Sequence, residues 1–245
     1  MLRRVHTANL TAGEIALDPA ASRHARDVLR LSQGTQVEVF DDAGHVGMGA
    51  IISLSPQVIV RITTIAPAPI DRMFKLTIAS AVPKGERADW MIEKLSELGC
   101  WRFVPLATDR SVVLPEGRNK HQRWIRIATE AAKQSRRHGV MQITNLTPLK
   151  DALVAGERTF HLSTQPGVLP LPELLAMDPS TPLTLLVGPE GGWSDEEIEL
   201  FASAQAPGVS LTSTVLRVET AAICAAAVVM TTAALVAASN RADEP

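Results

Sequence analysis

The stretch LTLLVGPEGGWSDEEIE, residues 183–199, constrains the fold of this chain more than any other part. Its first five residues form an apolar run with branched side chains, typical of a strand that is covered on both faces. Gly188, Gly191 and Gly192 then remove Cβ atoms where the chain must turn sharply or where a ligand comes close. Ser194 is a favourable N-cap residue with acidic residues after it, so we predict a helix there. Open α/β sheets bind their ligands at such strand-to-helix turns.

The same stretch limits the kind of ligand. Its glycine spacing matches neither GxGxxG nor GxxxxGK[ST], so neither a dinucleotide fingerprint nor a P-loop is predicted. Asp195, Glu196 and Glu197 occupy the first turn of the expected helix and disfavour a phosphate there. The ligand is therefore expected to be adenosine-like, and neutral to cationic rather than a polyphosphate. A tight connection without any ligand is the alternative that the residues alone leave open.

Bulk properties indicate a protein of the cytoplasm. The chain has 245 residues, enough for one large domain or two smaller ones. Cys100 and Cys224 lie in apolar helical stretches without metal-ligand spacing, so we expect buried thiols in a reducing compartment and no metal. The N-terminus lacks the apolar run of a signal peptide. The long uncharged segment 221–238 is dominated by alanine, which favours a buried or subunit-interface helix over a membrane span.

Charge is distributed unevenly along the chain. The net charge is −2 overall, but residues 71–150 carry +7 and residues 151–245 carry −9. Most of the positive charge lies on the expected helix 119–137, whose apolar stripe includes Trp124 and Ala128. The middle of the chain is therefore a candidate surface for a polyanion, and an ordinary solvated helix face is the alternative.

Residues 1–70 are predicted to form a small, mostly β domain. Strands are expected at 36–40, 46–53 and 57–64, after a helix at 20–31. The arginines of that helix suit phosphate contacts, although surface solubility explains them equally well on charge alone. The sequence Ala-Pro-Ala-Pro that starts at residue 66 is a stiff linker and marks the expected domain boundary.

From residue 71 to residue 245 strands and helices alternate, which is the pattern of an α/β domain. Three polar loops, around Gln165, Gly191 and Val215, each follow an expected strand. Because the carboxyl ends of parallel strands meet at one edge of a sheet, these loops are expected to converge. That convergence predicts a ligand site more strongly than any single motif does. The expected strands are 74–82, 102–106, 158–163, 183–187 and 209–211, and the expected helices are 86–98, 119–137 and 221–238.

Six stretches in this order resemble one known family over nearly the whole chain. The family is the RsmE family of 16S rRNA uridine-N3 methyltransferases, in the SPOUT superfamily. The matching stretches are RHARDVLRLSQG from Arg23, VPKGERADWMIEKLSELG from Val82, DRSVV from Asp109, EAAKQSRR from Glu130, LLVGPEGGWSDEEIE from Leu185 and VLRVETAA from Val215.

The resemblance implies a PUA-like RNA-binding β-barrel over residues 1–70. It implies a SPOUT α/β methyltransferase domain with a trefoil knot over residues 71–245. S-adenosylmethionine is then the cofactor, the substrate is 16S ribosomal RNA within the small subunit, and the enzyme is a homodimer with each site near the subunit interface. The chain departs from the family at Thr212, where the family usually has glycine, and at Thr214, where it often has arginine.

Residue type and position, taken together with the resemblance, give the expected site residues. Arg217 is the expected stabiliser of a uridine anion. Glu219 is the expected base or orienting group, with a purely structural acid at a helix N-terminus as its alternative. The expected RNA-binding residues are Arg23, His24, Arg30, Lys84, Arg110, Gln134 and Arg137. The expected cofactor-binding residues are Leu162, Ser163, Gln165, Val187, Gly188, Glu190, Gly191, Gly192, Leu211, Thr212, Val215, Leu216 and Arg217.

Three other functions compete with this interpretation. A SPOUT methyltransferase acting on another RNA, such as tRNA, is hard to separate because phosphate contacts carry no sequence information. A non-catalytic RNA-binding protein predicts RNA binding without affinity for the cofactor. An unrelated nucleotide-using α/β enzyme is disfavoured by the missing phosphate motifs.

Overall fold

The computed structural model describes residues 2–66, 74–115, 117–137, 139–153, 158–178 and 182–242. The chain forms two compact units. One unit comprises Met1–Met73 with Ala132–Val140, and the other comprises Phe74–Ala131 with Met141–Pro245. Of the expected linker only Ala66 is described, and its remaining residues lie outside the described ranges.

The first unit is built on a five-stranded sheet in the order β1-β3-β4-β5-β2. β1 pairs with β3 in parallel, and the other pairs are antiparallel. Branched aliphatic side chains fill its interior. At Gly49 an added Cβ would lie 2.6 Å from the carbonyl oxygen of Arg61, so glycine permits the close approach of β4 and β5. The elements are β1 (Arg3–His6), β2 (Gly13–Ala16), α1 (Pro19–Arg23), the π-helical turn η1 (His24–Val28), β3 (Gln36–Phe40), β4 (Val46–Ser53) and β5 (Ile59–Ala66).

The expected helix at 20–31 is divided into α1 and η1. Asp18 caps α1, because its Oδ1 accepts hydrogen bonds from the backbone of Ala20 at 2.7 Å and of Ala21 at 2.8 Å. The wider π-turn changes which residues face the sheet. Helical spacing over 20–31 places Val28 and Leu31 on one apolar side. Leu31 is buried as expected, but Val28 is 66% exposed, so the placement of Val28 was wrong.

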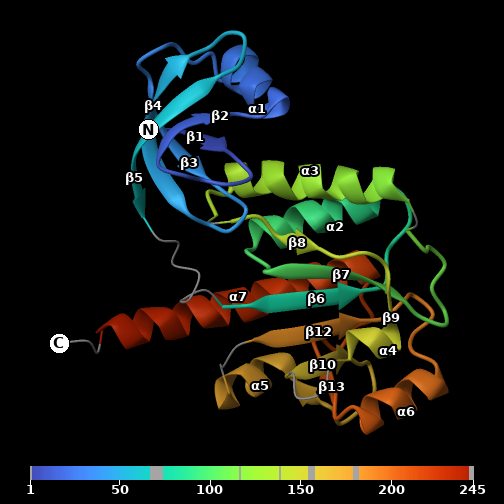
Figure 1. The fold of residues 1–245 in the computed structure, drawn as a ribbon. Coiled ribbons are helices and arrows are strands. Elements are labelled where there is room, and N and C mark those ends of the chain that lie inside the picture. Colours follow the sequence, from blue (N-terminus) through green and yellow to red (C-terminus); the bar gives the residue numbers. More distant parts are fainter. Residues whose placement is uncertain are drawn as a thin grey trace. The chain divides into compact units, whose positions relative to one another are not determined.

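The second unit contains an eight-stranded parallel sheet, in the order β11-β13-β10-β12-β6-β7-β8 with β9 paired to β7 (Figure 1). β12 lies inside the sheet between β10 and β6, and all five of its residues are buried. The prediction of a strand covered on both faces is therefore confirmed. The strands are β6 (Leu76–Ser80), β7 (Arg102–Ala107), β8 (Gln142–Ile143), β9 (Thr147–Pro148), β10 (Thr159–Leu162), β11 (Leu169–Pro170), β12 (Leu183–Val187) and β13 (Gly208–Ser210).

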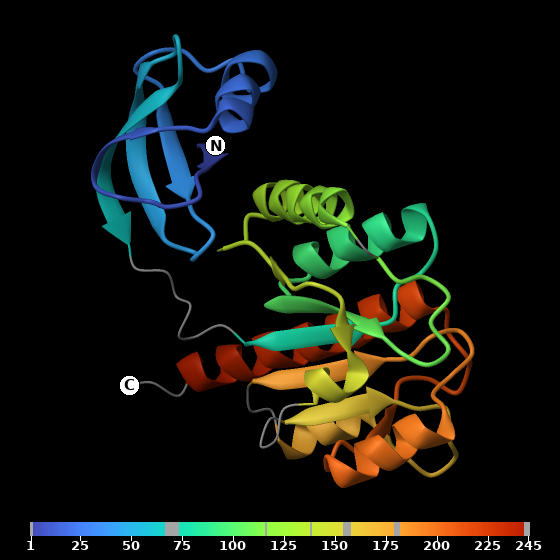
Figure 2. The ribbon, with the colours of Figure 1, turned by 45° about the vertical axis from the view of Figure 1, so that its right-hand side comes forward.

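Helices cover both faces of this sheet. α7 crosses β6 and β12 and packs against α2 and α5, while α4 and α6 contribute to a core cluster on the other face (Figure 2). Helical spacing predicts an apolar side of α2 that contains Trp90, Met91 and Leu95. Met91 and Leu95 are buried as predicted, but Trp90 is 47% exposed and does not belong to this side. The helices are α2 (Glu86–Glu97), α3 (Arg118–Gln134), α4 (Leu149–Ala152), α5 (Leu171–Met177), α6 (Asp195–Ser203) and α7 (Val218–Ala242).

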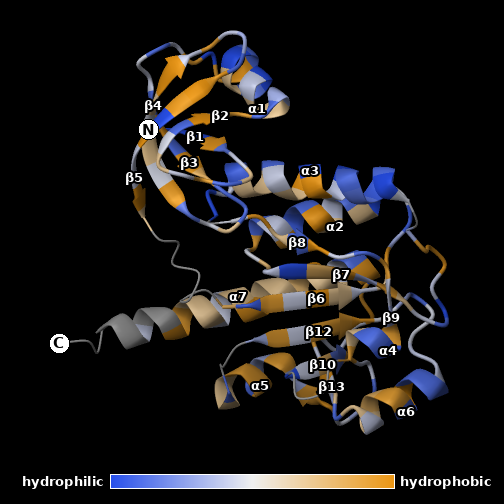
Figure 3. Ribbon diagram, viewed as in Figure 1, coloured by the Kyte–Doolittle hydropathy of each residue, from blue (hydrophilic) through white to orange (hydrophobic). Residues whose placement is uncertain are grey.

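α7 is the one described helix with the length and hydropathy that a membrane span requires, over Val218–Val236. A core helix of a folded domain passes the same test. Ala222, Ala225 and Val229 are fully buried against the rest of the unit, so the first half of α7 is a core helix. Figure 3 shows the contrast with α3, whose first turns are strongly hydrophilic.

Candidate active site

The loops around Gln165, Gly191 and Val215 follow three strands that are neighbours in the sheet. β13 pairs with β10 and β10 pairs with β12, all in parallel, so the three loops leave the same edge. The loops after β10 and β12 are joined directly, because Trp193 Nε1 donates a hydrogen bond to the carbonyl oxygen of Leu162 at 3.0 Å. The predicted convergence is thus present in the fold.

A pocket of about 500 Å³ lies between the loop after β10 and the loop after β13. Its volume is in the range of small-molecule sites. Five expected cofactor-binding residues line it: Ser163, Gln165, Leu211, Thr212 and Val215.

The other expected cofactor-binding residues do not line that pocket. They lie at the ends of β10 and β12, in the glycine-rich loop and just before α7: Leu162, Val187, Gly188, Glu190, Gly191, Gly192, Leu216 and Arg217.

The two threonines that depart from the family pattern bond to each other. Thr212 Oγ1 donates to the carbonyl oxygen of Thr214 at 2.8 Å and accepts from the Thr214 backbone at 3.3 Å. A hydroxyl that bonds to nearby backbone in this way fixes a turn. Thr212 therefore contributes to the shape of the pocket wall through a local bond, and its side chain is exposed.

The glycine-rich loop is held by close packing. A Cβ at Gly188 would lie 2.8 Å from Cε2 of Trp193, so the indole ring occupies the place of a side chain. Gly192 has a φ of 72°, a conformation that favours glycine. Arg110 Nη1 donates to the carbonyl oxygens of Gly191 at 2.9 Å and Trp193 at 3.0 Å. Arg110, expected to contact RNA, thus also shapes this loop.

Ser194 caps α6, as predicted. Its Oγ accepts from the backbone of Glu197 at 3.2 Å, and Glu197 Oε2 accepts from the backbone of Ser194 at 2.8 Å, which completes a capping box. Ser194 Oγ also donates to Asp109, whose backbone donates to Glu197 at 3.0 Å. Glu197, one of the acidic residues that disfavour a phosphate at this helix, therefore also fixes α6 to the loop after β7.

Arg87 contacts two of the expected site residues, Glu190 and Glu219, and was not itself predicted as a site residue. Its Nη1 lies 3.3 Å from Oε1 of Glu219 and 3.4 Å from Oε1 of Glu190. Glu219 is 4% exposed, and its Oε2 has no hydrogen-bond partner among the described residues. The stretch VPKGERADW contains Arg87, but Glu219 is 132 positions away and nothing in the sequence pairs them.

His161 lies in β10 and packs against α6. Its ring stacks on Phe201 with centroids 4.1 Å apart, and Nδ1 donates to the carbonyl oxygen of Ala206 at 2.8 Å. Burial lowers the pKa of His161 below its ordinary value, although the hydrogen bond to Ala206 acts in the opposite direction. The folded protein therefore holds His161 neutral.

We expect the stability of the fold to decrease in acid because burial disfavours the charged form of His161. Between the lowered pKa of folded His161 and its ordinary value of about 6.5, the unfolded chain binds more protons than the folded chain, so stability falls as pH decreases through this range, by at most about 1.4 kcal/mol per pH unit. Melting temperatures measured from pH 7.5 to 5.5 should decrease more steeply for the wild type than for His161→Gln. Equal slopes for the two proteins would contradict this assignment.

The expected RNA-binding residues differ in exposure. Those with exposed side chains are Arg23, Arg30, Lys84, Arg110 and Gln134, and His24 is partly buried. Arg137 is only 8% exposed, because its side chain is enclosed within the folded chain. Its position does not suit direct contact with RNA.

The residues at this edge fit S-adenosylmethionine. The pocket offers apolar walls at Leu211 and Val168 and backbone polar groups of two loops, which suits an adenosine moiety. Glu219 is buried, and one of its oxygens has no hydrogen-bond partner among the described residues. Together with the nearby Glu190 it supplies negative charge suited to a cationic group. The geometry thus fits a cofactor with an adenosine moiety and a cationic group, bound at one edge of a parallel sheet.

Residues 71–230 match the model of an RNA methyltransferase domain, and residues 17–63 match that of an RNA methyltransferase PUA domain. The chain is 32% identical to ribosomal RNA small subunit methyltransferase E from Synechocystis over 84% of this chain and 69% of the relative. It is 29% identical to the Bacillus subtilis protein of the same name, over 81% of this chain and 82% of that one.

Two solved structures agree. A ribosomal RNA small subunit methyltransferase E from Neisseria gonorrhoeae bound to S-adenosylmethionine has a TM-score of 0.81 at 25% identity, covering 94% of this chain and 98% of that one. A Legionella pneumophila chain in complex with the cofactor has a TM-score of 0.80 at 30% identity, with the same coverage. The chain belongs to the family of ribosomal RNA small subunit methyltransferase E, the RsmE family.

Proposed function

We propose that this enzyme transfers the methyl group of S-adenosylmethionine to N3 of one uridine in 16S ribosomal RNA. The observation that carries the proposal is the convergence of the three loops beside a buried carboxylate, within a chain of the RsmE family. The cofactor supplies an electrophilic methyl group on a sulfonium. The protein must then position the uridine and stabilise it as a nucleophile.

Arg217 is the proposed stabiliser of the uridine anion. Uridine N3 carries a proton that must be lost or shared before the nitrogen attacks, and negative charge then develops on the base. Arg217 directly precedes α7 and is exposed, and its side chain makes no hydrogen bond or ion pair with the described residues. Its guanidinium is therefore available to a ligand.

Glu219 is the proposed orienting group, and Arg87 holds it in place. The unpartnered Oε2 of Glu219 can accept a proton or a hydrogen bond from a ligand, while Oε1 faces Arg87. Because Arg87 also reaches Glu190, the pair connects the glycine-rich loop to the start of α7. Such a link would hold the glycine-rich loop and the start of α7 in fixed positions relative to each other.

The free energies of unfolding of variants test whether Arg87 and Glu219 interact. Arg87→Gln leaves the buried carboxylate without its cation and is expected to cost about 1–2 kcal/mol, less than a fully buried pair because Arg87 is 38% exposed. Adding Glu219→Gln removes the buried charge and should recover most of the loss. Denaturant unfolding of both single variants and the double variant gives the coupling energy. Lys84→Gln, an exposed cation, is the control, and strictly additive losses would contradict the pairing.

The proposed cofactor-binding residues are those of the three loops. The pocket between the loops after β10 and β13 would take the adenosine, and the glycine-rich loop would approach through its backbone. The proposed RNA contacts are the exposed Arg23, Arg30, Lys84, Arg110 and Gln134 and the partly buried His24, without the buried Arg137.

We also propose that the enzyme is a homodimer. Only 33% of the apolar window of α7 is buried within one chain, and Val215 at the pocket is 83% exposed. A second subunit would cover apolar surface of this kind. Sedimentation of the purified protein at the mass of one chain, 26.3 kDa, would contradict this proposal.

A trefoil knot is the proposed path of the C-terminal segment. Ser163 donates from its backbone to the carbonyl oxygen of Val209 at 2.9 Å, so the chain segments after β10 and β13 leave the sheet side by side. α7 then returns across β6 and β12. A threaded path of this kind would hold the pocket loops against each other.

Mapping of modified nucleotides tests the function in the cell. In a strain that lacks this gene, mass spectrometry of 16S ribosomal RNA should show the loss of one N3-methyluridine, restored by the wild-type gene. An unchanged level of N3-methyluridine would refute the proposal. Loss of a modified uridine from tRNA instead would favour the competing SPOUT substrate.

A further inference from the structure

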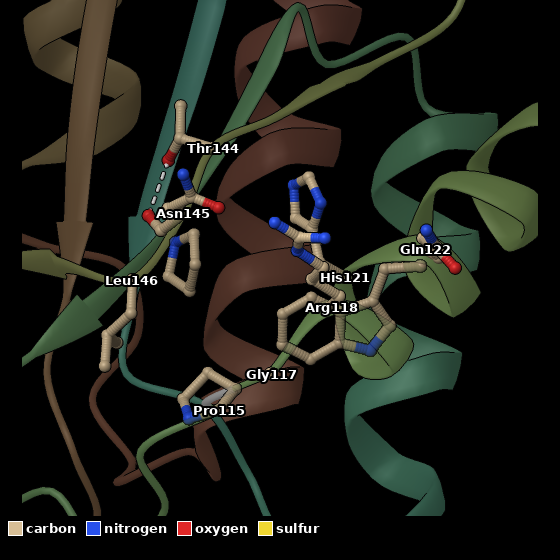
Figure 4. A pocket seen from close by; sticks show the side chains of 10 residues that line it. Pro115, Gly117, Arg118, His121, Gln122, Thr144, Asn145 and Leu146 are labelled. Atoms are coloured by element: carbon tan, nitrogen blue, oxygen red, sulfur yellow. Dashed lines mark hydrogen bonds between the residues drawn. The ribbon is translucent and has the colours of Figure 1, made fainter.

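A second pocket, of about 510 Å³, lies in the same unit away from the three loops. Its walls come from the start of α3 and the segment just before it, and from residues 144–146, which follow β8. Figure 4 shows Arg118 and His121 on one side and Asn145 and Leu146 on the other. The proposed methyltransferase site does not use any of these residues.

The polar groups of this pocket are held ready for a ligand. His121 Nε2 lies 3.0 Å from the carbonyl oxygen of Ile143, which only accepts, so Nε2 is the donor of this bond and Nδ1 is left for a ligand. The backbone carbonyl oxygen of Asn145 accepts from the hydroxyls of Thr144 at 3.1 Å and Thr147 at 2.9 Å, which fixes the segment. The side-chain amide of Asn145 has no partner among the described residues.

The remaining walls are apolar or cationic. Trp124 is 2% exposed and anchored by a hydrogen bond from Nε1 to Asp89 at 3.1 Å, so its ring is a rigid wall. Leu146 and Pro115 add apolar surface, and Arg118 adds a positive charge at the pocket. Among the described lining residues none is acidic.

This combination matches the chemistry of an unpaired nucleotide. A nucleobase has flat apolar faces and an edge of donors and acceptors, which suit the apolar walls, the Asn145 amide and the His121 ring. The adjoining phosphate suits Arg118. A duplex presents neither its base faces nor its full pairing edges, so a single-stranded segment is the ligand that fits.

We propose that this pocket is a second RNA subsite, which holds an unpaired nucleotide near the methylated uridine. The inference rests on the proposed function, because it assigns the pocket to the same RNA. Pro105 of β7 lines the pocket, and β7 lies three strands from β10 in the sheet. At about 4.8 Å per strand the separation is roughly 14 Å, or about four nucleotides at the 3.4 Å rise of a stacked strand.

The test uses the double variant His121→Ala/Asn145→Ala and a fragment of 16S ribosomal RNA that the wild type methylates. Fluorescence anisotropy at several salt concentrations should give a Kd about 10-fold higher than that of the wild type, with an unchanged salt slope, because no phosphate contact is removed. Affinity for S-adenosylhomocysteine should stay unchanged. If the double variant folds poorly, the single variant Asn145→Ala is tested in its place. It removes only an exposed amide without a hydrogen-bond partner among the described residues.

Arg126→Ala is the matched control, because Arg126 is an exposed cation of the same positively charged helix, outside the pocket, where a polyanion would contact it. It should weaken binding with a salt slope reduced by about one, as expected for a phosphate contact. RNA with a single abasic nucleotide at the recognised position should lose affinity for the wild type but not for the double variant.

If the wild type methylates the RNA and the double variant binds the RNA with the same affinity as the wild type, the proposed subsite is refuted. A reduced salt slope in the double variant would overturn it as well, since the pocket would then act through charge alone. A wild type that binds RNA through this pocket but methylates no uridine would instead refute the proposed function.

Discussion

Gly188→Ala is expected to lower both the stability of the fold and the affinity for S-adenosylhomocysteine. The added Cβ would lie 2.8 Å from the Trp193 ring, and moving the ring breaks its hydrogen bond to Leu162. Overpacking of this kind costs about 1–3 kcal/mol, which corresponds to a melting temperature lower by roughly 2–10 °C for a chain of this size. Calorimetry should show cofactor binding at least about 10-fold weaker.

Gly191→Ala is the matched control in the same loop. Its Cβ would lie 3.4 Å from the Arg110 side chain, an ordinary contact, so the melting temperature should not change. If the cofactor approaches this backbone, Gly191→Ala weakens binding without destabilising the fold. Wild-type affinity in both variants would contradict the assignment of the glycine-rich loop to the cofactor site.

Arg217→Ala is expected to reduce kcat by about 10²–10³, the usual loss when one group that stabilises developing negative charge is removed. Because the Arg217 side chain is exposed and makes no hydrogen bond or ion pair with the described residues, the melting temperature should be unchanged. Single-turnover methylation of 16S ribosomal RNA measures the chemical step directly.

Arg217→Lys should restore part of this rate, since it keeps the positive charge but not the planar group. Arg126→Ala, an exposed arginine of α3, is the control for a general loss of charge and should alter RNA affinity rather than the rate at saturating RNA. A wild-type rate in Arg217→Ala would show that another group stabilises the uridine.

Local signals in the sequence were sufficient for the strand and the helix start that frame the site. The buried run of β12 and the N-cap at Ser194 depend on neighbouring residues, and both are as predicted. The convergence of the loops followed from the parallel sheet. Local reasoning was wrong where backbone geometry changed, as at Val28, which the π-turn exposes.

Contacts between distant segments were not predictable from the pattern. Arg87 meets Glu219 only because α2 and α7 pack together, and Arg110 meets Gly191 across 81 positions. Thr212 was a departure from a family pattern in the sequence, whereas the fold shows its hydroxyl bonded to Thr214. The sequence thus located the edge of the sheet that carries the site, and the tertiary contacts specified how its residues are held.

The most direct test of the proposed reaction uses purified components. Small ribosomal subunits from the deletion strain are incubated with the enzyme and S-adenosylmethionine carrying an isotopically labelled methyl group, and the nucleosides of the 16S ribosomal RNA are analysed by mass spectrometry. We predict label in N3-methyluridine at one position, and none with Arg217→Ala over the same time. Label confined to any other nucleoside, or none with the wild type, would contradict the account.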